Sequence, residues 1–539
     1  MKRKILIPIV MLLILTLSFS ACSKGTEESS KSTSVDTSGP KKIEETKSEE
    51  EKKPVELTVE VFERSVAGQL PADDNWNTDY IKENLKKEFP YINVTYVPVP
   101  RTQEKEKLNI LMAAGDAPDI CVTYDEAMLY NYIQQGGVHE IGEYIDQYGA
   151  TLKDFLGETL NYGVFDGKQY AVPAKRVLLA KYGSFLRKDW LDKVGLDMPT
   201  TTEEFYSMLK AFKEMDPGNL GDSNIPFALT MNYSVPEWPA ATLLQSFITE
   251  MTEEEFYTLP QWLKPGYKEG MRFLNKLFNE GLINKDFPLD KDSATYKELI
   301  SQGKVGSFIN DSGLPLGSGG ILESLEKNVP GAELAAMDPF KNYEGKTAKE
   351  IYSPVGIFAF VPKTCEHPAE AIIYLDFISR QDVRFALQNG VEGVNYELNE
   401  DGIPIPLEAP EGDRKAMSPA SIDTTLTING SDYGDAELNV KAASLRYTNP
   451  VHRQLYIDQY NLSIKDGYYQ PRFDRPILAE SKYSGVLLQV GSEMFAKTIT
   501  CKPGDFDKLY DEYVQEYLDK GGQEVIDEKI EAYKAMKGN

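Results

Sequence analysis

An alternation of strand-like and helix-like segments near residue 55 constrains the fold of this chain more than any other feature of its sequence. Residues 55–61 alternate apolar and polar side chains, which is typical of a strand, and residues 92–96 do the same. Between them, residues 76–89 carry apolar side chains at helical spacing. A strand–helix–strand unit of this kind predicts an α/β fold with a largely parallel sheet.

Two further helices are predicted from their apolar spacing and their ends. Thr201 and Glu204 fit a capping box at the start of one helix, whose apolar residues continue through Phe212. Residues 506–517 trace one apolar helical face, and the glycine pair at 521–522 would end that helix. These apolar faces predict core packing rather than cofactor binding.

The N-terminus has the layout of a secretory signal. Residues 2–4 are basic, and residues 5–19 are almost wholly apolar, a run shorter than the roughly 20 residues that a membrane-spanning helix needs. Small residues then precede Cys22, an arrangement that resembles the lipobox of bacterial lipoproteins, although Phe19 stands where that pattern usually has leucine. The resemblance implies a signal peptide over residues 1–21 and a lipid on Cys22. An ordinary signal peptide with an incidental cysteine is the alternative.

The tract after this cysteine is almost wholly polar. Residues 23–54 contain only Val35 and Ile43 as sizeable apolar side chains. Such a tract buries too little surface to offset its ordering entropy, so we expect a disordered tether over residues 22–54 that spans roughly 30 Å. A lipid, a tether and a folded body together predict a protein anchored to the outer face of the cell membrane.

Composition weighs against several functions for the body. The chain has a formal net charge of −26, which opposes binding to nucleic acid and to anionic lipid head groups. Cys121, Cys365 and Cys501 lie far apart without zinc-like spacing, and we expect all three to be unpaired. The 3 histidines form no H-E-x-x-H pair. We therefore predict no cofactor and no nucleic-acid partner.

Three stretches carry a more specific signal. They are "LNILMAAGDAPDICVTYDEA" at 108–127, "DGKQYAVPAKR" at 166–176 and "SQGKVGSFIND" at 301–311. In this order and spacing they resemble the extracellular solute-binding proteins of carbohydrate ABC importers, the family that includes maltose-binding protein. The large lipoprotein branch of Gram-positive bacteria is the most similar, and the resemblance extends over residues 55–536.

The resemblance implies a two-lobed, periplasmic-binding-protein-like fold of type II, in which crossing hinge strands join two α/β lobes. A solute would bind in the cleft between the lobes, and the permease would recognise the closed form. We expect the chain to cross between lobes near Pro173, Tyr352 and Asn395. This places the first lobe at 55–173 and 352–395, and the second lobe at 174–351 and 396–539.

The resemblance also implies cleft residues, and sugar chemistry adds others. A sugar site stacks aromatic rings on C–H faces and directs carboxylates, amides and guanidinium groups at hydroxyls. From the resemblance we expect cleft contacts from Thr123, Tyr124, Asp125, Glu126, Lys175, Arg176, Asn310 and Asp311. From chemistry alone we add Trp76 and Trp238, which lie in loop-like settings, although packing on a lobe surface is the alternative for both.

One loop resembles a calcium site of relatives. The stretch "DPGNLGDSNIPF" at 216–227 retains Asp216, Asn219 and Asp222 as oxygen donors, but it is one residue short and lacks the bidentate glutamate. Calcium prefers six or more oxygens, so we predict no metal at this loop.

These observations predict a monomeric, membrane-anchored binding protein that captures an oligosaccharide and delivers it to the permease subunits of an ABC importer. We expect it not to be an enzyme. A tethered glycoside-processing enzyme, a binding protein for a non-sugar solute such as a peptide, and a purely structural surface lipoprotein are the alternatives. The 84 acidic residues make chance carboxylate pairs inevitable, so their number does not support the glycosidase.

Overall fold

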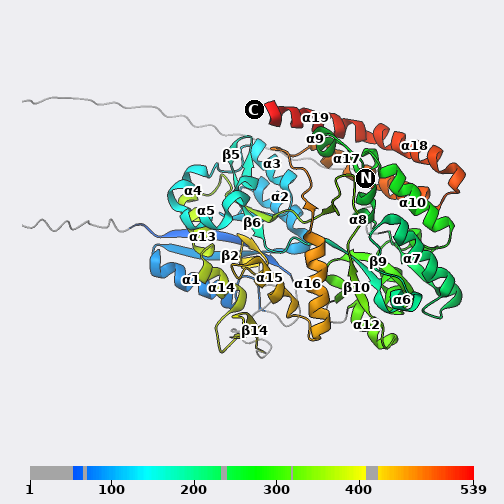
Figure 1. Cartoon of the computed structure of the whole chain (residues 1–539). Helices are drawn as coiled ribbons and strands as arrows, with labels where there is room; N and C mark the ends of the chain where they lie inside the picture. Colours follow the sequence, from blue (N-terminus) through cyan, green and yellow to red (C-terminus); the bar gives the residue numbers. More distant parts are fainter. Residues whose placement is uncertain (1–51, 65–69, 232–239, 317–319, 408–422, 539) are drawn as a thin grey trace, which may run out of the picture. The chain divides into compact units, whose positions relative to one another are not determined.

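The structure is a computed structural model that describes residues 52–64, 70–231, 240–316, 320–407 and 423–538 (Figure 1). The chain divides into two compact units, Met1–Lys52 and Lys53–Asn539, and the described elements belong to the second. Cys22, nearly all of the predicted tether and Trp238 lie outside the described residues. In the described ranges, no helix is both long enough and apolar enough to cross a bilayer.

The first sheet contains the predicted strand–helix–strand unit. β1 (Val55–Glu63) and β2 (Ile92–Pro100) pair in parallel, with α1 (Trp76–Glu88) between them in sequence. A parallel bridge from Val59 to Ile120 connects β1 to four further strands in the order β15-β6-β12-β3. These are β3 (Cys121–Thr123), β6 (Ala171–Arg176), β12 (Val355–Phe360) and β15 (Ile428–Asn429).

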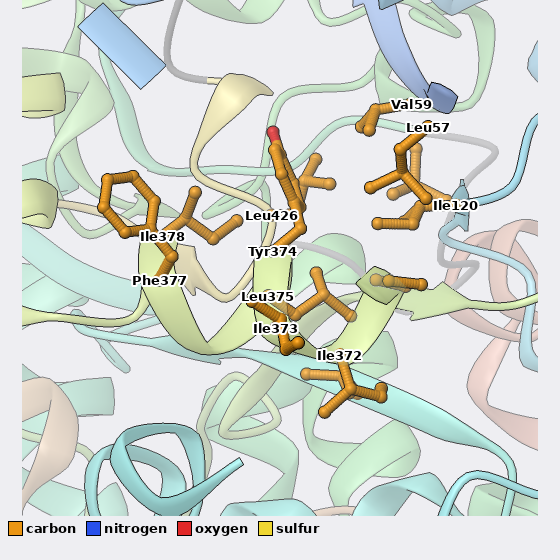
Figure 2. Close-up of a cluster of buried hydrophobic side chains, with 14 of the residues drawn as sticks. Leu57, Val59, Ile120, Ile372, Ile373, Tyr374, Leu375, Phe377, Ile378 and Leu426 are labelled. Atoms are coloured by element: carbon orange, nitrogen blue, oxygen red, sulfur yellow. The ribbon is translucent and has the colours of Figure 1, made fainter. Parts of the chain in front are cut away.

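Helices form a hydrophobic core on each face of this sheet. On one face, apolar side chains of α13 pack toward Leu57, Val59 and Ile120 (Figure 2). A separate cluster contains Leu129, Phe165 and Phe360. The helices of this region are α2 (Glu104–Ala114), α3 (Glu126–Gln134), α4 (Gly142–Tyr148), α5 (Ala150–Leu156), α13 (Pro368–Ile378) and α14 (Gln381–Asn389).

The second sheet has its own core. Its strands run in the order β10-β7-β9-β8, with β8 parallel to β9 and β7 antiparallel to both β9 and β10. They are β7 (Tyr182–Arg187), β8 (Ile225–Ala228), β9 (Val305–Asp311) and β10 (Leu334–Met337). Trp190 is fully buried there and meets Phe212 edge to face at 5.5 Å between ring centroids.

Many helices pack around the second sheet, in two hydrophobic clusters. They are α6 (Lys188–Val194), α7 (Thr202–Met215), α8 (Ala241–Leu244), α9 (Glu253–Thr258), α10 (Tyr267–Asn279), α11 (Ala294–Ser301), α12 (Ile321–Asn328), α15 (Ala436–Ser444) and α16 (Pro450–Ile464). The predicted start of α7 is confirmed, because the Thr201 hydroxyl accepts a hydrogen bond from the Glu204 amide at 3.1 Å. The Glu204 carboxylate turns back to Thr200 instead of completing the predicted box at Thr201.

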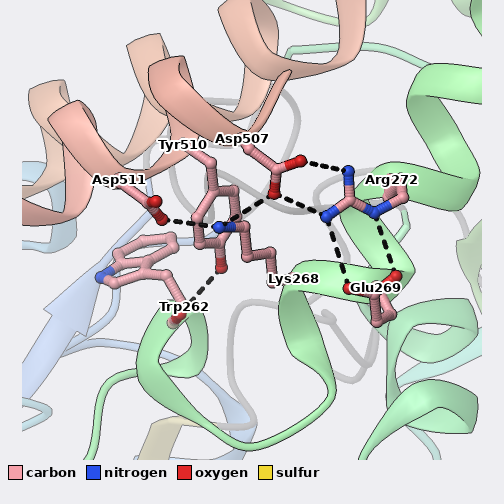
Figure 3. Close-up of polar contacts among 7 residues, drawn as sticks. All are labelled: Trp262, Lys268, Glu269, Arg272, Asp507, Tyr510 and Asp511. Atoms are coloured by element: carbon pink, nitrogen blue, oxygen red, sulfur yellow. Dashed lines mark hydrogen bonds and ion pairs between the residues drawn. The ribbon is translucent and has the colours of Figure 1, made fainter. Parts of the chain in front are cut away.

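The chain ends in three helices, α17 (Leu478–Thr500), α18 (Phe506–Tyr517) and α19 (Gln523–Gly538). The predicted helix end is confirmed at Gly521, where a φ of +113° turns the chain from α18 into α19. Ion pairs from Arg272 and Lys268 of α10 to Asp507 join α18 to the second core (Figure 3). The remaining short strands are β4 (Val164–Phe165), β5 (Lys168–Gln169), β11 (Lys349–Glu350), β13 (Tyr396–Leu398), β14 (Pro404–Pro406) and β16 (Gly467–Tyr468).

Three segments connect the two sheets. Residues 177–181 lead from β6 to β7, and residues 351–354 lead back from β11 to β12. The chain then stays with the first sheet beyond Asn395, because β15 pairs with β6 and Leu426 belongs to the same core as Leu57. These contacts favour crossings at 177–181, 351–354 and 430–435, and the expected crossings near Pro173, Tyr352 and Asn395 remain predictions.

Candidate functional site

A cavity of ≈ 410 Å³ lies where the connecting segments meet the ends of both sheets. From the first sheet, Arg176 reaches it at the end of β6 and Asn429 at the end of β15. From the second sheet, Asp311 reaches it at the end of β9. The remaining lining residues are Leu178, Ala180, Ser312, Gly313, Tyr352, Gly430, Arg446, Tyr447, Tyr456 and Tyr460, and we call this the tyrosine–arginine cavity.

Tyrosine rings form much of the wall. Tyr447 and Tyr456 lie 5.3 Å apart between ring centroids, and Tyr456 and Tyr460 lie 6.3 Å apart. The Tyr447 hydroxyl donates to the Gly313 carbonyl at 3.1 Å, and this bond holds α15–α16 to the end of β9. Burial raises the pKa of Tyr456 to about 12, so its hydroxyl stays neutral at physiological pH. Such rings offer flat apolar faces together with neutral hydroxyl groups.

Two arginines and one aspartate supply the charge. The Arg176 Nε donates to the Ser353 carbonyl at 3.1 Å, and its guanidinium lies 4.8 Å from the centroid of the Tyr352 ring. The Arg446 Nε donates to the Ala443 carbonyl at 2.7 Å. Burial lowers the pKa of Arg176, and the hydroxyls of nearby tyrosines oppose that shift.

The Asp311 carboxylate is engaged within the protein. Its Oδ1 accepts a hydrogen bond from the Gly313 amide at 3.0 Å. The pKa of Tyr352 is raised, first by burial and then by the neighbouring Asp311 carboxylate. The aspartate therefore holds the turn after β9, lies near Tyr352, and still faces the cavity.

Tyr124 extends the surface toward the first core. Its ring stacks on Phe62 at 6.0 Å and lies 4.1 Å from the Arg101 guanidinium. It is near enough to Arg176 to affect the pKa of that guanidinium. A hydrogen-bonded pair of Arg64 and Asp423 lies beside it, and Tyr124 adds to the raised pKa of Arg64 after Asp423.

A second cavity, of ≈ 420 Å³, is lined by other parts of the chain. Its walls include Lys181 and Glu350, the aromatic rings of Tyr182, Phe256, Tyr257, Tyr468 and Phe473, and the charged residues Lys264, Glu480 and Lys529. Lys181 pairs with Glu350, and Lys529 pairs with Glu480 at 2.5 Å. We call it the paired-charge cavity, because its carboxylates already neutralise lysines of the same wall.

Comparison with known families identifies the chain. A family model described as bacterial extracellular solute-binding protein matches residues 72–384. This chain belongs to that family. The predicted family is therefore confirmed, and so is the predicted α/β fold of the periplasmic-binding-protein type. Members of the family are extracellular binding proteins, which agrees with the predicted location and with the expectation of a binding rather than a catalytic protein.

Relatives match the solute-binding protein over most of its length. It is 26% identical over 501 residues to "Lipoprotein LipO" of Bacillus subtilis (strain 168), covering 89% of this chain and 93% of LipO. It is 27% identical over 477 residues to "Polygalacturonan/rhamnogalacturonan-binding protein YtcQ" of the same strain, covering 85% of this chain and 88% of YtcQ. The structure of "S.pneumoniae ABC-transporter substrate binding protein FusA in complex with kestose" shares the fold, with a TM-score of 0.59, 18% identity, and coverage of 90% of this chain and 100% of FusA.

Of the residues predicted to contact solute, the structure brings Arg176 and Asp311 together in the tyrosine–arginine cavity and places Tyr124 beside them. Asn310 is buried behind Asp311, and its Oδ1 accepts a hydrogen bond from the Asp311 amide at 2.8 Å. Lys175 points the other way along β6, because its ammonium donates to the Phe155 carbonyl at 3.4 Å.

Three predicted residues at the end of β3 and just after it have partners that hold the local structure. The Thr123 hydroxyl accepts a hydrogen bond from the Asp125 amide at 3.0 Å. Asp125 caps α3 by accepting from the Met128 amide at 2.9 Å and lines a separate cavity beside α2 and α3. Glu126 forms an ion pair with Arg472 at 2.7 Å. In the described structure these side chains hold neighbouring segments and do not line the tyrosine–arginine cavity.

Of the two predicted tryptophans, Trp76 does not line the tyrosine–arginine cavity. Trp76 opens α1 and stacks on Tyr80 of the same helix at 5.1 Å between ring centroids. Trp238 lies outside the described residues.

Four lining residues were not predicted from the sequence: Arg446, Tyr447, Tyr456 and Tyr460. The spacing of Tyr456 and Tyr460 places both on one face of α16, which is a signal that the sequence contains. Nothing in the local sequence shows that this face meets the ends of β6 and β9, which lie more than a hundred residues away along the chain.

The loop that resembles a calcium site is closed by its own backbone. The Asp216 carboxylate accepts hydrogen bonds from the Leu220 amide at 2.9 Å and the Gly221 amide at 2.8 Å, and these bonds lower its pKa. Among the described residues, no group of three or more His, Cys, Asp or Glu side chains is arranged to hold a metal ion.

Proposed function

We propose that this solute-binding protein captures an oligosaccharide outside the cell and delivers it to the permease of an ABC importer. The observation that carries this proposal is the tyrosine–arginine cavity, which combines aromatic faces, neutral hydroxyls and charged groups between two sheets. Aromatic faces suit the C–H faces of sugars, and the polar groups suit ring hydroxyls. The names of YtcQ and of the FusA complex with kestose support a glycan ligand.

The position of the cavity supports hinge closure. Arg176 comes from the first sheet and Asp311 from the second, while residues 177–181 and 351–354 connect the two sheets beside them. A ligand that contacts both sheets stabilises the closed arrangement by its differential affinity for it. The permease would then recognise this closed form.

The carboxylate content of the cavity supports binding without hydrolysis. Among its described lining residues, Asp311 is the one carboxylate, and it is held by the turn after β9. Most glycoside hydrolases use a pair of carboxylates on either side of the bond that breaks. An arrangement with one engaged aspartate fits a binding protein better than the glycosidase alternative.

We further propose that Cys22 carries the lipid that anchors the protein, with residues 23–54 as the tether and the body acting as a monomer. Metabolic labelling of cells with a radioactive fatty acid should label the wild-type protein and not the Cys22→Ala variant. Equal labelling of both proteins would contradict the anchor without affecting the binding proposal.

Thermal unfolding with a panel of oligosaccharides tests the main proposal. A ligand at 100 times its dissociation constant should stabilise the folded protein by about 2.7 kcal/mol. Peptide and monosaccharide panels serve as controls. No shift with any glycan would contradict the proposal, and a rise in reducing ends during incubation would favour the glycosidase.

A further inference from the structure

We infer that the oligosaccharide bound in the tyrosine–arginine cavity is acidic, with sugar carboxylates that pair with Arg176 and Arg446. The inference rests on the proposed function and specifies its substrate class. Two guanidinium groups and one carboxylate line the cavity, so its wall carries a net positive charge, whereas the whole chain has a formal net charge of −26. A positive cavity on an acidic protein attracts anions locally while the rest of the surface repels them.

The partners of the arginines distinguish these two from most others in the chain. Ion pairs with carboxylates are formed by Arg64, Arg101, Arg187, Arg272, Arg380, Arg384 and Arg472. Arg176 and Arg446 have backbone carbonyls as hydrogen-bond partners, and no carboxylate of the described residues lies within ion-pair distance of either. Their positive charges are therefore left for a ligand.

A guanidinium group stays protonated even where it is partly buried and has no ionic partner. Arginine does not lose its proton at physiological pH, so burial of Arg176 leaves a permanent charge without an ionic partner. A carboxylate can bind the planar guanidinium through two parallel hydrogen bonds, which a sugar hydroxyl does not match. The Asp311 carboxylate is not placed to do this, because it accepts from the Gly313 amide.

The tyrosines of the cavity suit the rest of an acidic glycan. Their neutral hydroxyls and ring faces can contact the uncharged part of each sugar without repelling its carboxylate. Arg446 lies 5.8 Å and 5.7 Å from the ring centroids of Tyr447 and Tyr456, so a carboxylate on this arginine would place the attached sugar near both rings.

Calorimetric titration with matched glycans tests the inference. The probes are oligomers of galacturonic acid and of mannuronic acid, each compared with the same oligomer after methyl esterification of its carboxyl groups. We expect at least one acid to bind 10-fold or more tightly than its ester, and we expect this ratio to shrink between 50 and 300 mM NaCl because salt screens the attraction. An ester that binds as tightly as its acid, or a protein that binds neutral oligosaccharides alone, would overturn the inference.

A failure of the inference differs from a failure of the proposed function. If neutral glycans bind and acids do not, the protein remains an oligosaccharide receptor with a different specificity. If no glycan of either kind binds, the proposed function is overturned and the inference with it.

Two arginine variants locate the effect. Arg176→Gln and Arg446→Gln should each bring the ratio of ester to acid dissociation constants toward one, and the Lys variants should retain part of it. Arg272→Gln is the matched control, because this arginine pairs with Asp507 on α18 away from the cavity and should leave the ratio unchanged (Figure 3). Arg446 is exposed, so its variant tests the inference even if loss of the half-buried Arg176 impairs folding. An unchanged ratio in a folded Arg446→Gln protein would remove that residue from the site.

Discussion

The tyrosine–arginine cavity and the paired-charge cavity are similar in volume and aromatic content, but their charged side chains have different partners. The tyrosine–arginine cavity measures ≈ 410 Å³ and the paired-charge cavity ≈ 420 Å³. In the paired-charge cavity, Lys181 and Glu350 neutralise each other, and Gln470 donates to the same carboxylate at 2.7 Å. In the tyrosine–arginine cavity, the two arginines bond to backbone carbonyls. Volume and aromatic lining alone therefore do not distinguish a ligand-binding cavity from one whose charged groups hold chain segments together.

Paired charges in the second cavity hold chain segments together. Glu350 belongs to β11, which pairs with β16, and Gln470 follows that strand. Arg472, in the same segment, forms an ion pair with Glu126 and donates a hydrogen bond to the Tyr162 carbonyl, at 2.7 Å each. A ligand in this cavity would have to compete with ion pairs already formed, whereas a ligand in the tyrosine–arginine cavity would supply the missing partner.

The first core contains a buried carboxyl group that differs from the charged groups of both cavities. Glu60 is fully buried, its Oε2 accepts from the Val122 amide at 3.1 Å, and burial raises its pKa to about 8. Between its unfolded pKa near 4.5 and this value, the folded protein keeps a proton that the unfolded chain releases, so stability falls as pH rises. The full loss is on the order of 5 kcal/mol. Denaturation from pH 5 to pH 8 should show a steeper fall in the free energy of unfolding for the wild type than for Glu60→Gln. Parallel curves of this free energy against pH would contradict the prediction.

Replacement of a tyrosine should disrupt the packing of the tyrosine–arginine cavity. Tyr456 is buried between Tyr447 and Tyr460 and belongs to the hydrophobic cluster on the face of the second sheet opposite Trp190. Tyr456→Ala should lower the free energy of unfolding by about 3–5 kcal/mol, because it leaves a large void, and should weaken glycan binding. Thermal unfolding and calorimetry measure the two effects. Tyr343→Ala, at an exposed position, is the control and should change neither by much; a similar loss in both variants would count against the packing argument.

Breaking an ion pair should disturb the paired-charge cavity without affecting glycan binding. Glu350→Gln leaves Lys181 without its carboxylate, and both side chains are about one-fifth exposed, at 21% and 18%. We expect a loss of about 1–2 kcal/mol of stability after allowing for solvent screening. The double variant Lys181→Met/Glu350→Gln should recover part of this loss, as urea denaturation would show. Weaker glycan binding by Glu350→Gln would instead place the ligand in this cavity.

The smallest expected change in stability comes from one added methyl group. A Cβ at Gly313 would lie 3.1 Å from Cε2 of Tyr456 and 3.5 Å from the Tyr447 hydroxyl. Gly313→Ala should narrow the tyrosine–arginine cavity and weaken binding severalfold, with a stability change of about 1 kcal/mol or less. Gly485→Ala, where a Cβ would meet nothing within 4 Å, is the control in the same assays. Equal binding by wild type and Gly313→Ala would show that the ligand does not use this wall.

Local features of the fold were predictable because their causes lie within a few residues. The alternation at 55–61 gave β1, and the pairing of β1 with β2 in parallel follows from the helix between them. Thr201 capped α7 as expected, since an N-cap needs only its own side chain and the first turn. The third crossing was harder to predict, because the contacts that keep the chain with the first sheet as far as Asn429 are tertiary: β15 pairs with β6, and Leu426 packs in the first core.

The sequence by itself determined the α/β class, the family and two of the charged residues in the candidate site, Arg176 and Asp311, because these follow from periodicity and from motifs contiguous in the chain. Only the tertiary structure decided that α16 closes over these residues, that Glu126 pairs with Arg472, and that Arg176 and Arg446 keep unpaired charges. The reason is physical: a charge is compensated by whatever the fold brings within a few ångströms of it, and that neighbour can come from any part of the chain.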